Sequence, residues 1–396
     1  MKKTLIFNLL LIGLNVLSCK SNTEEYDSVV EMIPVHLNKS KSLPIEEIID
    51  KIELIPLETN DDCLLHSYRK MVYYKEIEIF AIFDIKCDVY LFSKEGKFIS
   101  NSLEARGQGP RQYWMGADML YNPYSKCIEV LGPWGTIYRY DTLFNFVEKI
   151  SLEQNELVFN HFEALSETQY ILATAPSFIS DLVVHFCDFE KKTIEKTVNY
   201  EKHLLGGPHM QNQFFLRFDD DFLFTPLGFD YHFYQIKTDL STITPVIKLD
   251  FGGDEITKKQ IERMTDFSFE TERKQKDMSR RKELTTISAV LKETSINIPI
   301  VKLINDKYVY LHIFTNHKRS NYIYNRKTRK SYYQATDDPF KIYFGLQMDD
   351  NVLITMPQPY EIEKYVNKNY MSQHDIEIFD KILEDDNPII VKYYLK

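Results

Sequence analysis

The sequence predicts an all-β protein, a six-bladed β-propeller with a helical insertion between the fourth and fifth blades and a short helix near the C-terminus. Three observations lead to this fold class. A pair of hairpins recurs with a period of about 45 residues. Its short apolar runs are rich in aromatic and β-branched residues. The length suggests two or three domains, yet no linker separates residues 50 and 396. Six repeated sheets that pack against one another explain all three observations.

The first hairpin of each unit consists of a short apolar run, a polar turn and a second apolar run. Asp, Asn, Ser and Lys occupy most of the turns, as in Asp219–Asp221 and Asp349–Asn351, and the glycine count of 13 is low for a propeller. These hairpins are expected at Lys70–Tyr74 with Ile77–Phe83, Met119–Tyr121 with Cys127–Leu131, Phe162–Leu165 with Tyr170–Ala173, Phe214–Phe218 with Phe222–Phe224, and from Ile300–Ile304 and Tyr343–Met348.

A second hairpin follows each of the first five, so each unit becomes a four-stranded sheet. The second hairpins are expected to begin near Val89, Ile137, Val184, Phe233 and Tyr322. The longest interval between units contains the charged helical insertion Glu255–Glu293, and a smaller helix is expected at Asp375–Leu383 with one apolar face. The strand Pro388–Leu395 is expected to pair in the same blade as Ile52–Leu57 and so to close the ring.

The amino terminus predicts the compartment. Two lysines precede a short apolar run that ends at Ser18 and Cys19, which is typical of a secretory signal and too short to span a bilayer. The small residue before Cys19 is typical of a bacterial lipobox; the alternative is an ordinary signal peptide with a chance cysteine. We therefore expect a signal peptide over 1–18, a lipid on Cys19, a flexible tether over 19–45 and the propeller over 46–396. The expected location is the bacterial cell envelope, anchored to a membrane and most naturally the outer membrane.

Composition excludes some functions. A net charge of −10 and a pI near 5.6 argue against nucleic acid as a partner, because phosphates would be repelled. Besides Cys19 there are four cysteines, whose spacing matches no disulfide framework or zinc motif, so free thiols are favoured over the possible disulfide pairings. They are Cys63, Cys87, Cys127 and Cys187. The ten histidines form no metal motif; His161, His209, His232 and His317 could meet only if different blades brought them together.

The sequence also resembles a known family, the six-bladed β-propeller lipoproteins of Bacteroidetes, which are NHL-like in shape and poorly defined in function. The resemblance covers nearly all of the mature chain. It rests on Ile55–Thr59, on Gly96-Lys97-Phe98 leading to Gly107–Pro110 and Tyr113, on Asp250-Phe251-Gly252, and on Asp386-Asn387-Pro388 with the closing Leu395-Lys396. At Arg111 and Gln112 the family more often has Gly and Glu, so this sequence departs from it there. The resemblance implies no catalytic residue.

The stretch GKFISNSLEARGQGPRQYW, residues 96–114, is the expected crossing from the first blade to the second. It lacks the lysine of a phosphate-binding loop and the third glycine of a dinucleotide motif, so it is not expected to bind phosphate. Gly107 and Gly109 are expected to supply positive φ angles and Pro110 to fix the turn. A structural corner is one interpretation of this stretch, and a ligand loop is the other.

Loops on the same face as this crossing carry aromatic and arginine side chains that suit a glycan or a peptide with acidic groups. The candidate ligand-binding residues at this channel-mouth face are Arg106, Gln108, Arg111, Trp134, Asp230, His317 and Arg319.

Three functions stay open. The first is a non-catalytic binding or interaction module. The second is a propeller enzyme acting on glycans, which would require acidic, His or Tyr groups to converge at the rim or in the channel. The third is a scaffold or sensor in an envelope assembly, with a protein partner on 255–293. No catalytic residue, metal or cofactor is predicted.

Overall fold

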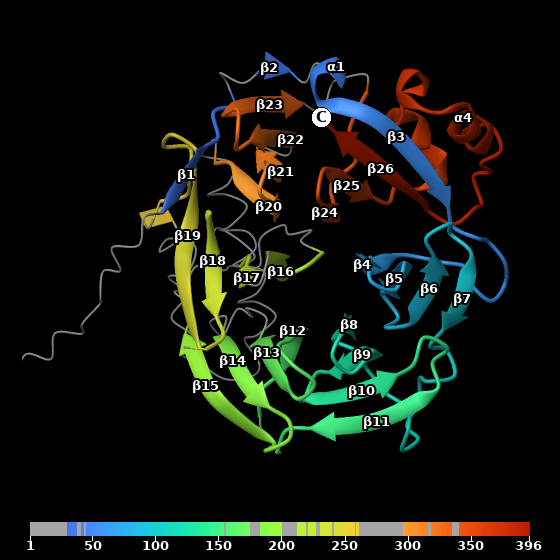
Figure 1. The fold of residues 1–396 in the computed structure, drawn as a ribbon, viewed down its shortest axis with the longest axis vertical. Helices are drawn as coiled ribbons and strands as arrows, with labels where there is room; N and C mark the ends of the chain where they lie inside the picture. Colours follow the sequence, from blue (N-terminus) through green and yellow to red (C-terminus); the bar gives the residue numbers. More distant parts are fainter. Residues whose placement is uncertain are drawn as a thin grey trace, which may run out of the picture.

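In a computed structural model the chain forms six sheets arranged as a ring around a central axis (Figure 1), and the strands within them pair antiparallel except for two short amino-terminal strands. The structure describes residues 30–37, 41–42, 45–153, 156–174, 183–199, 212–218, 221–226, 230–239, 241–257, 259–260, 296–315, 318–334 and 340–396. Each sheet is one blade, and its innermost strand is the first strand after the crossing from the preceding blade. The predicted six-bladed propeller is therefore confirmed.

The first three blades each have four strands. Blade 1 consists of β4 (Tyr68–Tyr74), β5 (Ile79–Asp84), β6 (Val89–Ser93) and β7 (Phe98–Asn101). Blade 2 consists of β8 (Asp118–Asn122), β9 (Cys127–Gly132), β10 (Thr136–Tyr140) and β11 (Phe146–Ser151). Blade 3 consists of β12 (Phe159–Ala164), β13 (Gln169–Thr174), β14 (Val183–Asp188) and β15 (Thr193–Asn199).

The other three blades include segments from the amino-terminal part of the chain. Blade 4 consists of β16 (Phe215–Phe218), β17 (Asp221–Phe224), β18 (His232–Lys237), β19 (Thr242–Asp250) and β1 (Glu31–Pro34). Blade 5 consists of β20 (Ile298–Ile304), β21 (Tyr308–Thr315), β22 (Lys318–Asn325), β23 (Lys330–Gln334) and β2 (Lys41–Ser42). Blade 6 consists of β24 (Gln347–Asp349), β25 (Val352–Thr355), β26 (Ile389–Leu395) and β3 (Ile49–Pro56), which follows the short helix α1 (Ile45–Ile48).

The two ends of the propeller meet in blade 6, as predicted. The strand β26 pairs with β3 in antiparallel register from Ile389 opposite Pro56 to Leu395 opposite Ile49. Figure 1 shows β3 in blue beside β26 in red. One blade thus contains both ends of the propeller, which ties the ring shut.

The expected tether over 19–45 is wrong for its second half. Glu31–Pro34 pair in parallel with Ile247–Asp250 and form the fifth strand of blade 4. Lys41–Ser42 pair in parallel with Tyr332 and Tyr333 of β23 and form the fifth strand of blade 5. Both segments cover a sheet edge whose N–H and C=O groups would otherwise lack partners within the sheet. The ordered part of the protein therefore begins before residue 46.

A third outer edge, that of β3, is covered by the connection between β25 and β26. This connection contains the 3₁₀ helices η1 (Pro359–Lys364) and η2 (Lys368–Tyr370) and the helix α4 (Gln373–Phe379). The backbone N–H of Leu54 donates to the buried carboxylate of Asp375 at 2.9 Å. The predicted short helix is present but begins two residues earlier and ends at Phe379, so Leu383 is exposed rather than on the apolar face. Apart from its first residues, the predicted insertion 255–293 lies outside the described residues.

The low glycine count is explained by the hairpin turns. Positive φ angles in these turns are adopted by ordinary residues, among them Glu78, Lys126, Lys192, Arg329 and Asp350. Such residues tolerate the left-handed region at a modest cost, so turns that glycine fills in other propellers do not require it here.

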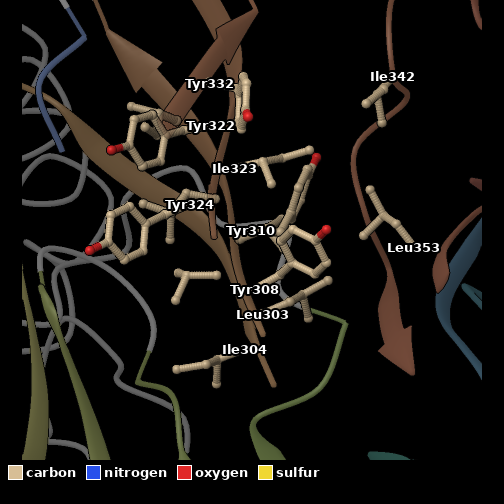
Figure 2. Packing of buried hydrophobic residues seen from close by; sticks show 14 of the residues in the cluster. Leu303, Ile304, Tyr308, Tyr310, Tyr322, Ile323, Tyr324, Tyr332, Ile342 and Leu353 are labelled. Carbon is tan, nitrogen blue, oxygen red and sulfur yellow. The ribbon is translucent and has the colours of Figure 1, made fainter. Parts of the chain in front are cut away.

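The core lies between neighbouring blades, where the faces of adjacent sheets pack together. Every residue of β5, β9 and β20 is buried. Figure 2 shows the packing of blade 5, in which Tyr310 and Ile323 lie on the side of Ile342 and Leu353 of the next unit. Tyr322 points to the opposite side, where its hydroxyl donates to the backbone oxygen of Pro34. All four described cysteines are free, as favoured, and only Cys87 is partly exposed. No described helix is long and apolar enough to cross a membrane.

Candidate functional site

The blade topology gives the ring two different faces. We call one the crossing face; it contains the segments that cross from the outermost strand of one blade to the innermost strand of the next, and the loops between second and third strands. The other, the turn face, contains the tight hairpin turns. All seven candidate residues were predicted on the crossing face, and the six that are described lie in its segments or at their ends.

The crossing from blade 1 to blade 2 is internally braced. Gly107 has a φ of +153°, and a Cβ there would lie 2.3 Å from the Gln112 side-chain oxygen. Gln112 Oε1 accepts from the N–H of Gly109. Gly109 does not have a positive φ angle, so the prediction that it supplies one is wrong. The hydroxyl of buried Tyr113 lies 2.6 Å from the Ser102 hydroxyl. Much of this stretch is therefore a structural corner.

The polar candidates in this crossing differ in their surroundings. Arg106 pairs with Asp88 at 3.3 Å, whereas Gln108 is exposed. The guanidinium of Arg111 lies 5.9 Å from the ring centroid of Phe146, in the outermost strand of blade 2. Arg111 is therefore at the outer perimeter of the ring, away from the innermost strands that surround the channel.

Asp230 is held by contacts within and between blades. Its carboxylate accepts from the N–H of His232 at 2.7 Å and from the hydroxyl of Tyr234 at 2.9 Å. The amine of Lys302, from blade 5, donates to the backbone oxygen of Asp230, and burial lowers the pKa of Lys302 to about 8. Asp230 thus fastens blade 4 to blade 5. His317 lies outside the described residues.

Arg319 lines a cavity of about 260 Å³ on the crossing face, between blade 5 and blade 6. The other lining residues come from three segments: the ends of the blade 5 strands, the crossing from β23 to β24, and η1 with the residue that follows it. They are His312, Ser320, Asn321, Gln334, Lys341, Ile342, Tyr343, Phe344, Glu361 and Tyr365. None of these ten residues was predicted, because they come from three segments whose approach depends on how two blades pack.

Large apolar side chains are exposed mainly on the crossing face. Among the described residues, nine of the thirteen exposed large apolar side chains lie in its segments. They are Leu64, Ile85, Leu103, Trp114, Met115, Trp134, Val158, Tyr360 and Leu383. Both tryptophans of the protein are in this set, each more than half exposed.

The central channel is the second polar site of the ring. A cavity of about 260 Å³ is lined by residues from the innermost strands of all six blades. Lys70 pairs with Asp118 at 2.7 Å, and His161 Nδ1 lies 3.6 Å from the other oxygen of Asp118. These three residues come from blades 1, 2 and 3, so the fold does bring titratable groups together in the channel.

Channel side chains also satisfy the inner edges of the sheets. The amide of Gln347 both accepts from and donates to the backbone of Tyr73, and Asn212 does the same for Met71. Since the innermost strand of a blade has no neighbouring strand on the channel side, such amides replace the missing ladder. Much of the polar lining is therefore structural. Within the described part of the chain, no group of three or more His, Cys, Asp or Glu residues is placed to hold a metal ion.

Glu163 is a channel residue with altered acidity. Burial raises the pKa of its carboxyl to about 7, and Arg217, 3.6 Å away, only partly opposes this. The side chain is 19% exposed. In the folded protein the protonated form therefore predominates below about pH 7, whereas a free glutamate is ionised there.

Replacement of Glu163 by Gln is expected to stabilise the protein increasingly as the pH rises. A carboxyl whose folded pKa lies above its unfolded value destabilises the fold as the pH passes from about 4.5 to about 7, by at most about 3 kcal/mol. Gln cannot ionise, so the advantage of Glu163→Gln over wild type in the free energy of unfolding should be smallest at about pH 4 and largest above pH 7.5. Denaturant titrations of both proteins at several pH values measure this difference. The contributions of all other titratable groups are the same in both proteins and cancel in the difference. A pH-independent difference would contradict the prediction.

The ring of six sheets, closed in the last blade by β26 and β3, defines a six-bladed β-propeller. Over residues 28–394 the sequence matches the family described as "Domain of unknown function (DUF4934)", and the chain belongs to that family. The match begins before β1, in agreement with the early start of the ordered part.

Comparison with solved structures finds similar chains at low sequence identity. A protein of Bacteroides fragilis NCTC 9343, named as an exported protein, is 14% identical with a TM-score of 0.68, and the match covers 93% of this chain and 100% of that chain. A member of the DUF4221 family from Bacteroides vulgatus is 9% identical with a TM-score of 0.47, over 88% of this chain and 98% of that chain. No curated protein sequence matches.

Proposed function

We propose that this protein is a lipid-anchored β-propeller of the bacterial cell envelope that binds a glycan or peptide ligand on its crossing face without transforming it. The observation that carries the proposal is the concentration of exposed apolar side chains, including both tryptophans, on that one face. Aromatic side chains with a polar edge or a neighbouring arginine suit ligands that are partly apolar and partly charged.

The proposed anchor is a lipid on Cys19. A similar fold in an exported protein of Bacteroides supports an envelope location. Eleven residues, 20–30, separate Cys19 from β1, and fully extended they span at most about 40 Å. The anchor would therefore hold the outer edge of blade 4 within about 40 Å of the membrane surface.

The anchor is tested with Cys19→Ser. We expect this variant to lose incorporation of a radiolabelled or alkyne-tagged fatty acid and to move from the membrane fraction to the soluble fraction, because a lipid chain contributes about 0.8 kcal/mol per buried CH₂. Wild type and Cys63→Ser, which alters a buried thiol of the propeller, serve as controls. Continued labelling of the Cys19→Ser variant would contradict a lipid on this residue.

Ligand binding is tested by probing glycan and peptide arrays with a form of the protein that begins at residue 20. Trp134→Ala should weaken binding of the ligand found by about 2 kcal/mol or more, because exposed aromatic anchors carry much of the energy at such surfaces. Tyr124→Ala, an exposed aromatic on the turn face, is the matched control and should leave binding unchanged. The ligand should be recovered chemically intact. A cleaved ligand, or equal losses in both variants, would contradict the proposal.

A further inference from the structure

Arg69 lies near the start of β4, where the innermost strand of blade 1 leaves the crossing face. It is an exposed residue, and it was not among the predicted site residues. Its guanidinium carbon lies 5.3 Å from the ring centroid of Phe83, and that ring is almost completely buried. A cation over the face of an aromatic ring is attracted to it. The core of blade 1 therefore helps to fix the position of this charge.

One edge of the guanidinium faces the backbone of the crossing into blade 2. Nη1 donates to the backbone oxygen of Gly116 at 3.4 Å and Nη2 donates to that of Ala117 at 3.5 Å, and both hydrogen bonds are long. Nη1 also lies 3.6 Å from Cys87 Sγ. These contacts leave the Nε–H and one Nη2–H of Arg69 without a partner among the described residues. Two parallel N–H groups of this kind match the two oxygens of one carboxylate.

No carboxylate of the described residues forms an ion pair with Arg69. The segments that contact it are the loop Ile85–Cys87 and the crossing at Gly116–Ala117, and both belong to residues 45–153, which are described without a gap. The two carboxylates that flank the loop, Asp84 and Asp88, are buried and already accept hydrogen bonds. Arg69 is therefore an accessible cation that no carboxylate of these segments neutralises.

Exposed apolar residues lie on both segments beside this cation. Ile85 is 56% exposed, and its N–H donates to the backbone oxygen of Ser67, two residues before Arg69. Trp114 and Met115, which are 57% and 43% exposed, immediately precede the backbone that the guanidinium contacts. Apolar surface of this kind gains free energy when a partner removes it from water.

We propose that Arg69, Ile85, Trp114 and Met115 form a docking surface for a peptide that carries an apolar side chain next to an acidic one. The inference rests on the proposed binding function and names one of its two ligand classes and a site for it. The Asp or Glu carboxylate of the peptide would accept from the Nε–H and Nη2–H of Arg69. The neighbouring apolar side chain would cover Ile85 and Met115.

The apolar residues of this surface favour a peptide over a glycan. In a peptide the apolar and the charged side chains are separate groups, so each can meet its own partner on the surface. A sugar carries a hydroxyl on nearly every carbon, and the hydroxyls that faced Ile85 and Met115 would lose their hydrogen bonds to water without replacement.

The test is an array of three degenerate heptapeptide libraries, probed with the form of the protein that begins at residue 20, which keeps every described residue. The first library has a central Glu flanked by mixtures of Leu, Ile, Val, Met and Phe. The second has Gln in place of Glu, and the third keeps Glu but has Ser, Thr, Asn and Gly in the flanks. Wild type should bind the first library at least about tenfold more tightly than either of the others, because each lacks one half of the contact.

Variants locate the binding on the protein. Arg69→Ala should bind the first and second libraries within about twofold of each other. Trp114→Ala should bind the first library about fivefold more weakly and keep the preference for Glu over Gln. Arg329→Ala removes an exposed arginine from the turn between β22 and β23, on the other face, and should behave as wild type.

Melting temperatures separate a loss of binding from a loss of folding. If Arg69→Ala melts at a lower temperature than wild type, Arg69→Lys decides in its place. Lysine keeps the charge but has no planar pair of donors, so the preference of Arg69→Lys for Glu over Gln should be at least about threefold smaller than that of wild type.

The inference is overturned if Arg69→Ala keeps the preference for Glu, if Trp114→Ala binds as wild type does, or if the third library binds as tightly as the first. It is also overturned if an oligogalacturonate on the same array binds at least as tightly as the first library and depends on Arg69, because the ligand is then an acidic glycan. If no library binds while the glycan and peptide arrays reveal a ligand that depends on Trp134, the inference fails and the proposed function stands. The proposed function itself fails if no array ligand depends on Trp134 or if the ligand is cleaved.

Discussion

Removal of residues Asn387–Lys396 is expected to abolish the cooperative folding of the whole ring. The deleted segment contains β26, which lies between β25 and β3 and pairs with both. Its loss leaves β3 without a neighbouring strand and opens one edge of β25, in the blade that joins the beginning of the propeller to its end. The effect should therefore extend to all six blades instead of remaining at one terminus.

The size of the loss follows from burial. Four aliphatic side chains of β26 are almost completely buried: Ile389, Ile390, Val391 and Leu395. Each contributes roughly 1.5–3 kcal/mol when buried, so together they are comparable with the whole stability of a typical protein, about 5–15 kcal/mol. Asn387 adds to this, because its side chain holds the crossing into blade 1 by donating to the backbone oxygens of Glu58 and Cys63.

Thermal unfolding followed by circular dichroism measures the effect in a form that begins at residue 20. Wild type should unfold in one cooperative transition, and the truncated protein should show none. A form that begins at residue 29 removes nine residues from the other end, before the first described strand, and should keep the transition. An unchanged melting temperature in the truncated protein would mean that the ring does not depend on this closure.

The blades could be predicted from the sequence because each hairpin is a local pattern. Each hairpin is recognised from apolar runs and turn residues, such as Asn305–Lys307, within about ten residues of sequence. The repeat of these hairpins then predicts how they combine into blades. The strands β1 and β2 left no such signal. They are four and two residues long, and each pairs with a strand more than 200 positions away, so their place depends on the complete ring.

The face of each candidate residue could also be predicted, but its distance from the channel could not. A crossing begins at the outermost strand and ends at the innermost one, so residues in a single crossing span the whole radius of the ring. Arg111 accordingly lies against the outer strand of blade 2, whereas Asp118, seven residues later, lines the channel. The cavity beside Arg319 depends in addition on the approach of η1 and on the fixed amide of Asn321, neither of which a local pattern encodes.

A buried ion pair that joins blades 2 and 3 gives the second large effect. Arg139, with 2% of its surface exposed, donates from Nε to Glu129 Oε1 at 2.9 Å, and Glu129 is completely buried. Tyr170 of blade 3 donates to the same carboxylate at 2.8 Å and accepts from the Arg139 guanidinium at 2.9 Å. The guanidinium also donates to Glu148 and to the backbone oxygen of Glu167. The partners of this charge therefore come from both blades: Glu129 and Glu148 from blade 2, and Tyr170 and Glu167 from blade 3.

Replacement of Arg139 by Met should lower the free energy of unfolding by about 3–5 kcal/mol, because it leaves the carboxylate of Glu129 buried without its counter-ion. The double variant Arg139→Met with Glu129→Leu should be less destabilised than the single variant, since it buries no unpaired charge. Lys94→Met, which breaks an exposed ion pair with Glu78 on the turn face, is the control and should cost no more than about 1 kcal/mol. Guanidinium chloride titrations of the four proteins measure these differences. If the double variant proves at least as unstable as Arg139→Met, the loss comes from packing and hydrogen bonds between the blades, and an uncompensated charge is not its cause.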